Sequence, residues 1–437
     1  MTLKKISISN IKALQFFQLI RFGALFLIGI LLSKSELGKT NIGHYETFLL
    51  IAGAFTFFWV NGFLKVMMPL SSEKREEDKP LLVFNSFILL MGFSVLSAIL
   101  VYILNQPFSS YLLNGNEVPM PLVLAVYILL NSPALMTEYI YLINDKAKNI
   151  VIYGILLFTL QVIVVSLPAL LGYGLNYTLF GLMGIAALKY IWLLIVLSNY
   201  SKAKIQPSLL REYLKYGMPL VLSTLLSSSA RYIDGFIITS QFSPDDFAVF
   251  QYGARELPLA VLLSNSLSMA MLTKFARKDI ASPLAEFRSE VYRLHWLLFP
   301  ISAVLLLTSH WFYPLLFNLQ FEQSATIFNI YLLLIVSRLL FPQTLITAKK
   351  MNRIIVSASF FEILINVALS LILARTIGIT GVAYATIVAY LFEKIYLAVA
   401  CKKRLGISLH QYVPMKIYLV SSVLLLSVFT LVEFMLY

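Results

Sequence analysis

Long apolar runs recur from one end of the chain to the other and limit the folds that it can adopt. Each run is about 20 residues long, the length that an α-helix needs to cross the hydrocarbon core of a membrane. Membrane β-strands are about half as long, so the runs indicate helices. The sequence predicts an all-α membrane protein with about thirteen transmembrane helices, at residues 10–33, 43–68, 80–104, 119–143, 150–172, 177–198, 211–240, 247–273, 290–316, 324–347, 354–374, 379–400 and 416–436.

Composition and charge support a membrane protein. Of the 437 residues, 59% are hydrophobic and 13% are charged, whereas a soluble domain has about a quarter of its residues charged. A net charge of +13 would suggest nucleic acid in a soluble protein. Here most of the basic residues lie in short loops, where they meet anionic lipid, so we expect no nucleic-acid partner. The single cysteine, Cys401, cannot form an intramolecular disulfide.

The basic residues predict the orientation of the chain. If the N-terminus is cytoplasmic, only Lys34, Lys39 and Arg375 fall in the outside segments, in agreement with the excess of Lys and Arg on the cytosolic side of membrane proteins. The first apolar run lacks a small-residue cleavage site, so we expect a retained span. An odd number of spans leaves the C-terminus outside. The cytosolic basic residues are then Lys4, Lys5, Lys12, Lys74, Arg75, Lys79, Lys146, Lys148, Lys202, Lys204, Arg211, Lys274, Arg277, Lys278, Arg288, Lys349, Lys350, Arg353, Lys402, Lys403, Arg404 and Lys416.

The second half of the chain echoes the first. "GHYETFLL" opens the second span, and "FQYGAREL" opens the eighth. The offset corresponds to six spans, an even number, so the two halves would be parallel and related by a pseudo-two-fold axis along the membrane normal. We therefore expect an N-terminal lobe at residues 1–200, a C-terminal lobe at 201–403 with a cleft between the two, and an extra C-terminal transmembrane helix at 404–437.

Several charged residues lie deep inside the predicted spans. A cation at the centre of a membrane helix costs at least about 2.5–3.5 kcal/mol, so it is tolerated where it faces a water-filled cavity or a partner. The basic residues at depth are Arg21, Lys189, Arg231, Arg255 and Arg338. Fewer acids lie at similar depth: Asp234, Glu256 and Glu362. The positive surplus predicts an internal site for an anion.

Neighbouring residues leave alternatives open for some of these charges. Gln15 and Gln18 precede Arg21 at helical spacing and form a polar stripe with it, which favours a cavity. Arg231 and Asp234 are three residues apart and share a helix face, so they form either an internal ion pair or part of a site.

For the other charges, pairing or lipid contact competes with substrate binding. Lys189 and Arg338 either bind substrate or form structural pairs with Glu362 or Glu393. Lys65, near the inner end of its span, either faces a cavity or reaches to the lipid headgroups. Glu138 and Glu433 lie near span ends and are expected to face headgroups. The candidate substrate-binding residues are Arg21, Lys65, Lys189, Arg231, Asp234, Arg255 and Arg338.

Other classes of site have little support. The chain contains no GxxxxGK[ST] loop, which argues against an ATP-driven pump. The four histidines, His44, His295, His310 and His410, show no metal-ligand spacing. We expect no metal, no cofactor and no catalytic residues. The loops are short, which disfavours a membrane glycosyltransferase or ligase with a large outside loop.

The opening of the second half resembles a known transporter family. Residues 210–261 read "LREYLKYGMPLVLSTLLSSSARYIDGFIITSQFSPDDFAVFQYGARELPLAV", and residues 373–390 read "LARTIGITGVAYATIVAY". The "YGxP" turn, the "xID" in the span, the "YG" start of the next helix and the "GixGaaxAt" stretch resemble the Wzx-type polysaccharide and O-antigen flippases of the multidrug/oligosaccharidyl-lipid/polysaccharide (MOP) exporter superfamily. Members usually have twelve or fourteen spans, so thirteen is a departure.

The resemblance implies a flippase in the bacterial cytoplasmic membrane that moves undecaprenyl-pyrophosphate-linked oligosaccharide repeat units. It implies that cations of the first, second and eighth helices line a central cavity, which are Arg21, Lys65 and Arg255 here. Membrane lipids and possible polysaccharide polymerase and chain-length proteins would be partners. A cation-coupled multidrug exporter of the same superfamily is the main alternative, and a glycosyltransferase or ligase or a non-transporting scaffold are others.

Overall fold

The computed structural model describes residues 10–275 and 281–436, and this part of the chain consists of helices and loops without a β-strand. The predicted basic residues Lys4, Lys5, Arg277 and Lys278 lie outside the described residues. Contacts divide the chain into two compact units. Unit 1 contains residues 1–232 and 239–245, and unit 2 contains residues 233–238 and 246–437. The contacts therefore pass from one unit to the other within a single helix, later in the chain than residue 200.

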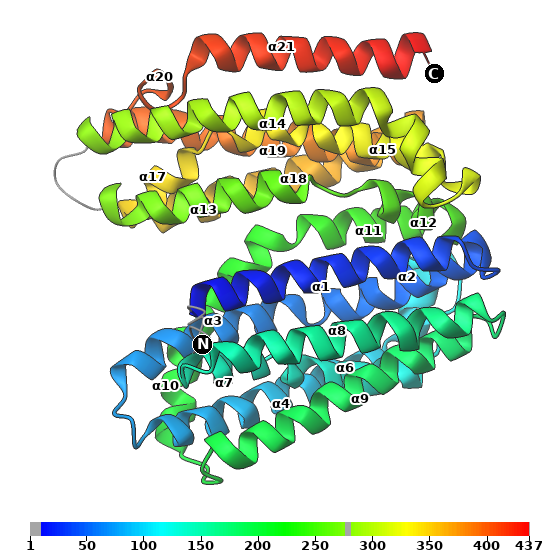
Figure 1. The fold of residues 1–437 in the computed structure, drawn as a ribbon, viewed down its shortest axis with the longest axis vertical. Helices are drawn as coiled ribbons and strands as arrows, with labels where there is room; N and C mark the ends of the chain where they lie inside the picture. Colours follow the sequence, from blue (N-terminus) through cyan, green and yellow to red (C-terminus); the bar gives the residue numbers. More distant parts are fainter. Residues whose placement is uncertain (1–9, 276–280, 437) are drawn as a thin grey trace, which may run out of the picture. The chain divides into compact units, whose positions relative to one another are not determined.

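Unit 1 is a bundle of long helices (Figure 1). In it, α1 packs on α8, α8 on α9, α4 on α6, and α3 on α10. Its core includes Trp59, Phe63 and Tyr213, which are almost fully buried. The helices are α1 (Asn10–Ser33), α2 (Gly38–Ala54), α3 (Phe57–Glu73), α4 (Lys79–Ile103), α5 (Asn105–Pro107), the π-helix η1 (Phe108–Leu112), α6 (Pro121–Ala134), α7 (Thr137–Ile143), α8 (Ala147–Leu170), α9 (Leu175–Tyr200) and α10 (Pro207–Ser228).

Glycines allow α3 and α10 to approach closely. A Cβ atom on Gly62 of α3 would lie 2.6 Å from the Cα atom of Val221 in α10, and one on Gly217 of α10 would lie 2.6 Å from the Phe63 ring. Small residues at helix crossings permit this spacing in membrane bundles. The two helices are therefore held at a distance that no larger side chain would allow.

Unit 2 contains the remaining helices, of which α18 and α19 form a closely packed hairpin. The hairpin turns at Gly378, whose φ of 69° is in the left-handed region that favours glycine. Its helices, with α11 shared between the units, are α11 (Ala230–Gln241), α12 (Pro244–Gly253), α13 (Pro258–Phe275), α14 (Ala281–Leu316), η2 (Leu319–Phe321), α15 (Gln323–Leu332), α16 (Leu334–Arg338), α17 (Pro342–Ala348), α18 (Asn352–Ile377), α19 (Ile379–Leu405), α20 (Leu409–Tyr412), α21 (Met415–Leu431) and η3 (Val432–Leu436).

The C-terminal helix α21 runs parallel to α14. Near its start, the Tyr418 ring lies 5.8 Å from the His295 ring of α14. Beyond its end, Glu433 Oε1 lies 2.9 Å from His310 Nε2, farther along α14. The two contacts keep the same order along both helices, so α21 ends on the side where α14 ends.

The helices agree with the predicted fold class, but thirteen uninterrupted spans are not found. Within the described residues, nine helices are long and apolar enough to cross a membrane, or eleven if two bent pairs each form one span. The predicted seventh span is divided between α10 and α11, and the eighth between α12 and α13. Charged residues and breaks shorten the apolar stretches there.

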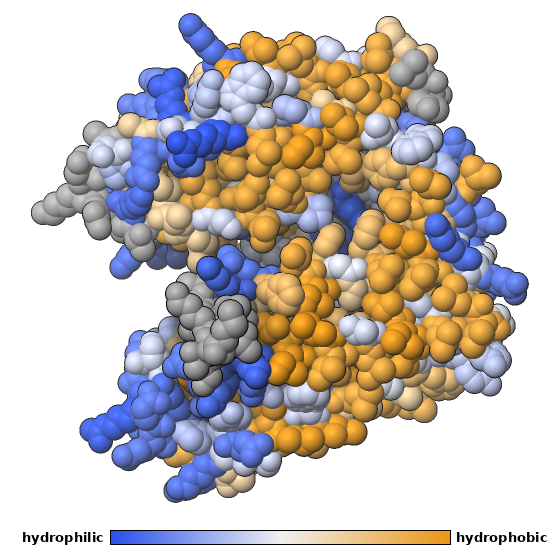
Figure 2. Space-filling model, viewed as in Figure 1, coloured by the Kyte–Doolittle hydropathy of each residue, from blue (hydrophilic) through white to orange (hydrophobic). Residues whose placement is uncertain are grey.

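The surface of each unit is that of a membrane protein. Figure 2 shows hydrophobic side chains over the flanks of the helices and hydrophilic ones near their ends. Large apolar side chains such as Ile163 in α8 and Leu307 in α14 are more than half exposed. An apolar lateral surface is expected where lipid, rather than water, surrounds the helices.

Candidate functional site

Arg21 and Lys65 are the partly exposed deep cations of unit 1. Arg21 lies midway along α1 and is half-buried, and its guanidinium is within electrostatic range of the Glu138 carboxylate. Gln15 and Gln18 on the same helix are exposed. Lys65 of α3 is exposed, and its Nζ donates to Thr224 Oγ1 of α10 at 3.5 Å. Both charges are therefore within reach of a ligand.

Lys189 has partners within the bundle. Its Nζ donates to Gln161 Oε1 of α8 at 2.9 Å and lies 5.4 Å from the centre of the Phe158 ring. It is also within electrostatic range of Glu138 and Arg21. The alternative of a structural pair with Glu362 or Glu393 named the wrong partners, because Gln161 occupies that position.

Glu138 is not at the lipid headgroups, as the sequence suggested, but inside unit 1. It lies in α7, and only 3% of its surface is exposed. The short helix α7 packs against α3, α8 and α9, which cover it. A carboxylate buried to this extent needs compensating charge or hydrogen bonds, and it has Arg21 and Lys189 in electrostatic range.

In unit 2, Arg255 and Glu256 lie in a break between two helices. Helix α12 ends at Gly253 and α13 begins at Pro258. Proline lacks the N–H that would continue the ladder and disfavours helical geometry in the residue before it, which explains the break. Non-helical backbone at membrane depth is tolerated where it is buried in protein or lines a water-filled cavity.

The two charges at this break have different surroundings. Glu256 forms an ion pair with Arg338 of α16, so Arg338 is paired, again with a partner other than Glu362 or Glu393. The Arg255 guanidinium lies 5.5 Å from the centre of the Tyr252 ring, within the range of a cation–π contact. The half-buried Arg255 is thus held beside an aromatic face.

Asp234 is deeply buried, with 2% of its surface exposed. Its Oδ2 accepts from Thr386 Oγ1 at 2.7 Å, and Asn366 Nδ2 donates to the same Thr386 oxygen at 3.2 Å. No ion pair to Asp234 occurs in the described part of the chain, so the predicted pair with Arg231 does not form. Arg231 itself is exposed.

Two further acids are buried in the α18–α19 hairpin. Glu362 of α18 and Glu393 of α19 are almost fully buried and interact electrostatically. Glu393 Oε2 accepts from Lys394 Nζ at 2.6 Å. Both lie near the middle of their helices, at a depth that the rise of 1.5 Å per residue made predictable. Among the residues that could be searched, no group of three or more His, Cys, Asp and Glu side chains could hold a metal ion.

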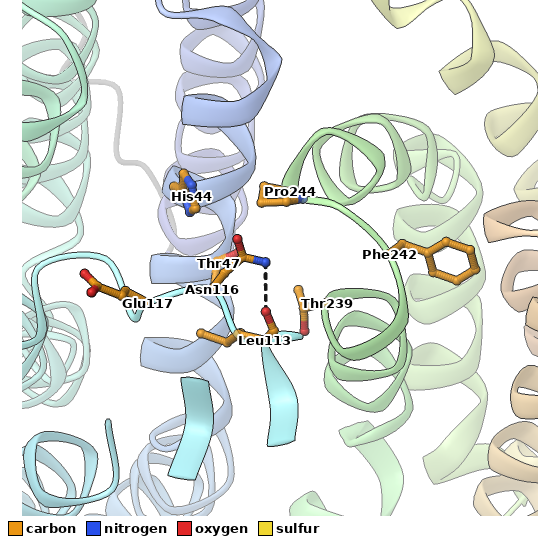
Figure 3. A pocket seen from close by; sticks show the side chains of 8 residues that line it. All are labelled: His44, Thr47, Leu113, Asn116, Glu117, Thr239, Phe242 and Pro244. Carbon is orange, nitrogen blue, oxygen red and sulfur yellow. Dashed lines mark hydrogen bonds between the residues drawn. The ribbon is translucent and has the colours of Figure 1, made fainter. Parts of the chain in front are cut away.

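A shallow pocket lies elsewhere in unit 1, near the start of α2. It encloses about 240 Å³ including open solvent. Figure 3 shows Glu117 and Phe242 at opposite ends, with His44, Thr47 and Asn116 between them. The Asn116 amide donates to the Leu113 carbonyl oxygen at 2.9 Å, which fixes one wall. None of the deep cations lines this pocket, so it is separate from the candidate headgroup residues.

Comparisons with known proteins identify the family. A family model described as "Polysaccharide biosynthesis protein" matches residues 31–326. The chain belongs to the polysaccharide biosynthesis protein family. No curated protein matches the sequence. Its membership is consistent with the flippase resemblance of the sequence.

Solved structures show the fold that this family member shares. The lipid II flippase MurJ in an inward closed conformation is similar with a TM-score of 0.69 and 19% identity, over 95% of this chain and 92% of that one. An inward-facing multidrug resistance MATE family transporter of the MOP superfamily has a TM-score of 0.69 and 13% identity, over 91% and 98%. A Vibrio cholerae MATE transporter has 0.57 and 14%, over 92% and 98%. The family member therefore has a MOP-type transporter fold.

Proposed function

We propose that this protein flips undecaprenyl-pyrophosphate-linked oligosaccharide repeat units across the bacterial cytoplasmic membrane by alternating access. The family and the MOP-type fold support a polysaccharide flippase. The observation that carries the choice of an anionic headgroup is that Arg21 and Lys65 lie deep in the helices of unit 1 with exposed or half-exposed side chains. Cations at such depth are stable where water or an anion reaches them.

A pyrophosphate headgroup fits these residues chemically. It carries about two negative charges, and a guanidinium binds phosphate oxygens through two parallel hydrogen bonds. An unpaired ion of this kind would not cross hydrocarbon alone. Cationic side chains remove much of that barrier while the lipid tail stays in the bilayer. An inside-negative potential favours outward movement by about 4–5 kcal/mol for two charges at 100 mV.

Unit 2 would contribute Arg255 to the same binding step. Transporters commonly bind substrates where a membrane helix is interrupted, and Arg255 lies in the interruption between α12 and α13. Lys189, Arg231, Asp234 and Arg338 complete the proposed substrate-binding set, although Lys189, Asp234 and Arg338 also have the internal partners described above. No bond is broken in transport, so the proposal includes no catalytic residue.

The test uses display of a surface polysaccharide in cells that depend on this protein. Arg21→Ala and Arg255→Ala are expected to abolish display while the amount of protein in the membrane is unchanged. Lys34→Ala removes the same charge from an exposed position at the end of α1 and serves as the control. Normal display in both arginine variants would contradict the proposed headgroup site.

A cation-coupled multidrug exporter is a second candidate, favoured by the buried carboxylates of unit 2, Asp234, Glu362 and Glu393. Such exporters use membrane-embedded acids to bind cations. The two functions differ in cargo: an exporter lowers the cellular content of lipophilic cationic dyes, whereas a flippase leaves it unchanged and supports polysaccharide display. We propose that the N-terminus is cytoplasmic, and that a polymerase and chain-length proteins receive the product.

A further inference from the structure

Glu138 is the buried carboxylate nearest to the proposed headgroup cations of unit 1. It lies in α7, one break after α6, and 3% of its surface is exposed. Burying an ionised carboxylate without a partner costs several kcal/mol. Its retention beside positively charged residues therefore needs an explanation other than lipid contact.

The charges that face Glu138 come from two different helices. Arg21 projects from α1 and Lys189 from α9, and both are within electrostatic range of the carboxylate. Lys189 already has an internal arrangement, because it donates to Gln161 Oε1 and lies over the Phe158 ring. Arg21 is half-buried and forms no ion pair shorter than 4 Å in the described part of the chain. Of the two cations, Arg21 is the one that a ligand can draw away.

We propose that Glu138 is a positioning residue that acts as an exchangeable counter-ion for Arg21. Without substrate, its charge attracts the guanidinium toward α7 and offsets part of the positive charge of unit 1. When a pyrophosphate group arrives, its oxygens replace the carboxylate as partners of Arg21, while Lys189 continues to compensate Glu138. On release, Glu138 attracts Arg21 back. This inference rests on the proposed function and assigns Glu138 a part in the same site.

The exchange has a consequence for affinity and for turnover. A negative charge beside the binding cation competes with the substrate anion, so its removal strengthens binding. An interaction of this kind across a protein interior of moderate dielectric predicts an increase in affinity of about threefold to tenfold. Because the counter-ion no longer helps to displace the headgroup, the maximum rate of transport falls.

The experiment uses the purified full chain in proteoliposomes. Binding of undecaprenyl pyrophosphate and the rate of its translocation are measured for the native protein, Glu138→Gln, Glu138→Asp and Arg21→Ala. Glu73→Gln makes the same chemical change at an exposed position in α3 and is the matched control. We expect tighter binding and slower translocation for Glu138→Gln, native behaviour for Glu138→Asp and Glu73→Gln, and weaker binding for Arg21→Ala.

A second readout does not depend on the substrate. The rate at which phenylglyoxal modifies Arg21, followed on its peptide by mass spectrometry, is expected to rise in Glu138→Gln and not in Glu73→Gln, since the carboxylate stabilises the charged guanidinium. An unchanged rate overturns the counter-ion role. Unchanged affinity in Glu138→Gln with a lower melting temperature also overturns it, because that result describes a structural residue only.

Failure of the proposed function has a different signature. If the native protein does not bind undecaprenyl pyrophosphate and Arg21→Ala changes nothing, the headgroup assignment is wrong, and the inference that rests on it is wrong too. If the native protein binds and Arg21→Ala does not, the headgroup site holds, and the behaviour of Glu138→Gln decides the inference alone.

Discussion

The two units bury charge of opposite sign. In unit 1, Arg21, Lys65 and Lys189 lie at depth against Glu138 alone. In unit 2, the acids at depth outnumber the bases. The acids are Asp234, Glu256, Glu362 and Glu393, and the bases are Arg255, Arg338 and Lys394. A positive surplus over the whole chain therefore belongs to unit 1.

The charges also differ in how they are satisfied. In unit 1, the cations Arg21 and Lys65 keep exposed or half-exposed side chains. In unit 2, Arg338 and Lys394 are paired with glutamates. Loss of a paired, buried charge is expected to affect stability, whereas loss of an accessible charge is expected to affect ligand binding. The following substitutions test that division.

The largest loss of stability is expected for Arg338→Ala in unit 2. It leaves Glu256 without its ion-pair partner, and removing one member of a buried pair costs about 3–5 kcal/mol. Because the two side chains keep 21% and 28% of their surface exposed, the lower end of that range applies. Thermal unfolding in detergent measures the effect. The double variant Arg338→Gln with Glu256→Gln should recover much of the loss, and an equal loss in the double variant would show that the pair is not the cause.

A smaller loss is expected for Thr386→Val, which removes the hydroxyl that donates to Asp234 Oδ2. Leaving a buried acceptor without its partner costs about 1–3 kcal/mol. Asp234→Asn keeps the shape and removes the charge, so it should retain or raise the melting temperature. If Asp234→Asn nevertheless abolishes transport, the carboxylate charge has a function besides the hydrogen bond. If both variants unfold at the native temperature, Asp234 is not buried as described.

A loss of about 1 kcal/mol is expected for Glu433→Gln, within the range of hydrogen bonds to a charged group. Glu433 Oε1 contacts His310 Nε2 and accepts from Asn329 Nδ2 at 2.5 Å, and these contacts hold the end of the C-terminal helix. The expectation that Glu433 faces headgroups was wrong, since its side chain is 6% exposed. Proteolysis of the C-terminal segment and thermal unfolding measure its attachment. Glu117→Gln, an exposed glutamate of the pocket in unit 1, is the control.

The sequence predicted the helical class, the MOP-type relationship and the depth of the charged residues. Apolar length and a fixed rise per residue are sufficient for these properties. Partners were harder to predict. Arg338 pairs with Glu256, 82 residues away in the chain, and such pairs depend on how each helix is rotated about its axis, which depth does not determine.

Two errors have local physical causes. Glu138 is near the end of a predicted span, but α7 packs against three helices, so the end of that span is covered by protein. The break at residues 254–257 had a signal in the sequence, since Pro258 follows two charged residues, and proline disfavours helix both at its own position and before it. Reading that signal would have placed Arg255 outside a regular helix.

The smallest effect on stability is expected for Lys65→Ala, and it is the sharpest test of the division between the units. Lys65 is exposed in α3, and its contact with Thr224 Oγ1 is long, at 3.5 Å. Surface substitutions of this kind change stability by about 0.5 kcal/mol or less. Binding of undecaprenyl pyrophosphate, measured on the same preparation, should nevertheless weaken about tenfold, as a direct hydrogen bond to a charged group would require.

Thr224→Val is the matched control for Lys65→Ala, because it removes the other partner of the same contact and keeps the positive charge. It is expected to retain the affinity for undecaprenyl pyrophosphate. If Lys65→Ala lowers the melting temperature as much as Arg338→Ala does and leaves the affinity unchanged, the cations of unit 1 are structural. The difference between the units would then be one of sign alone, and the accessible charge of unit 1 would no longer support a headgroup site.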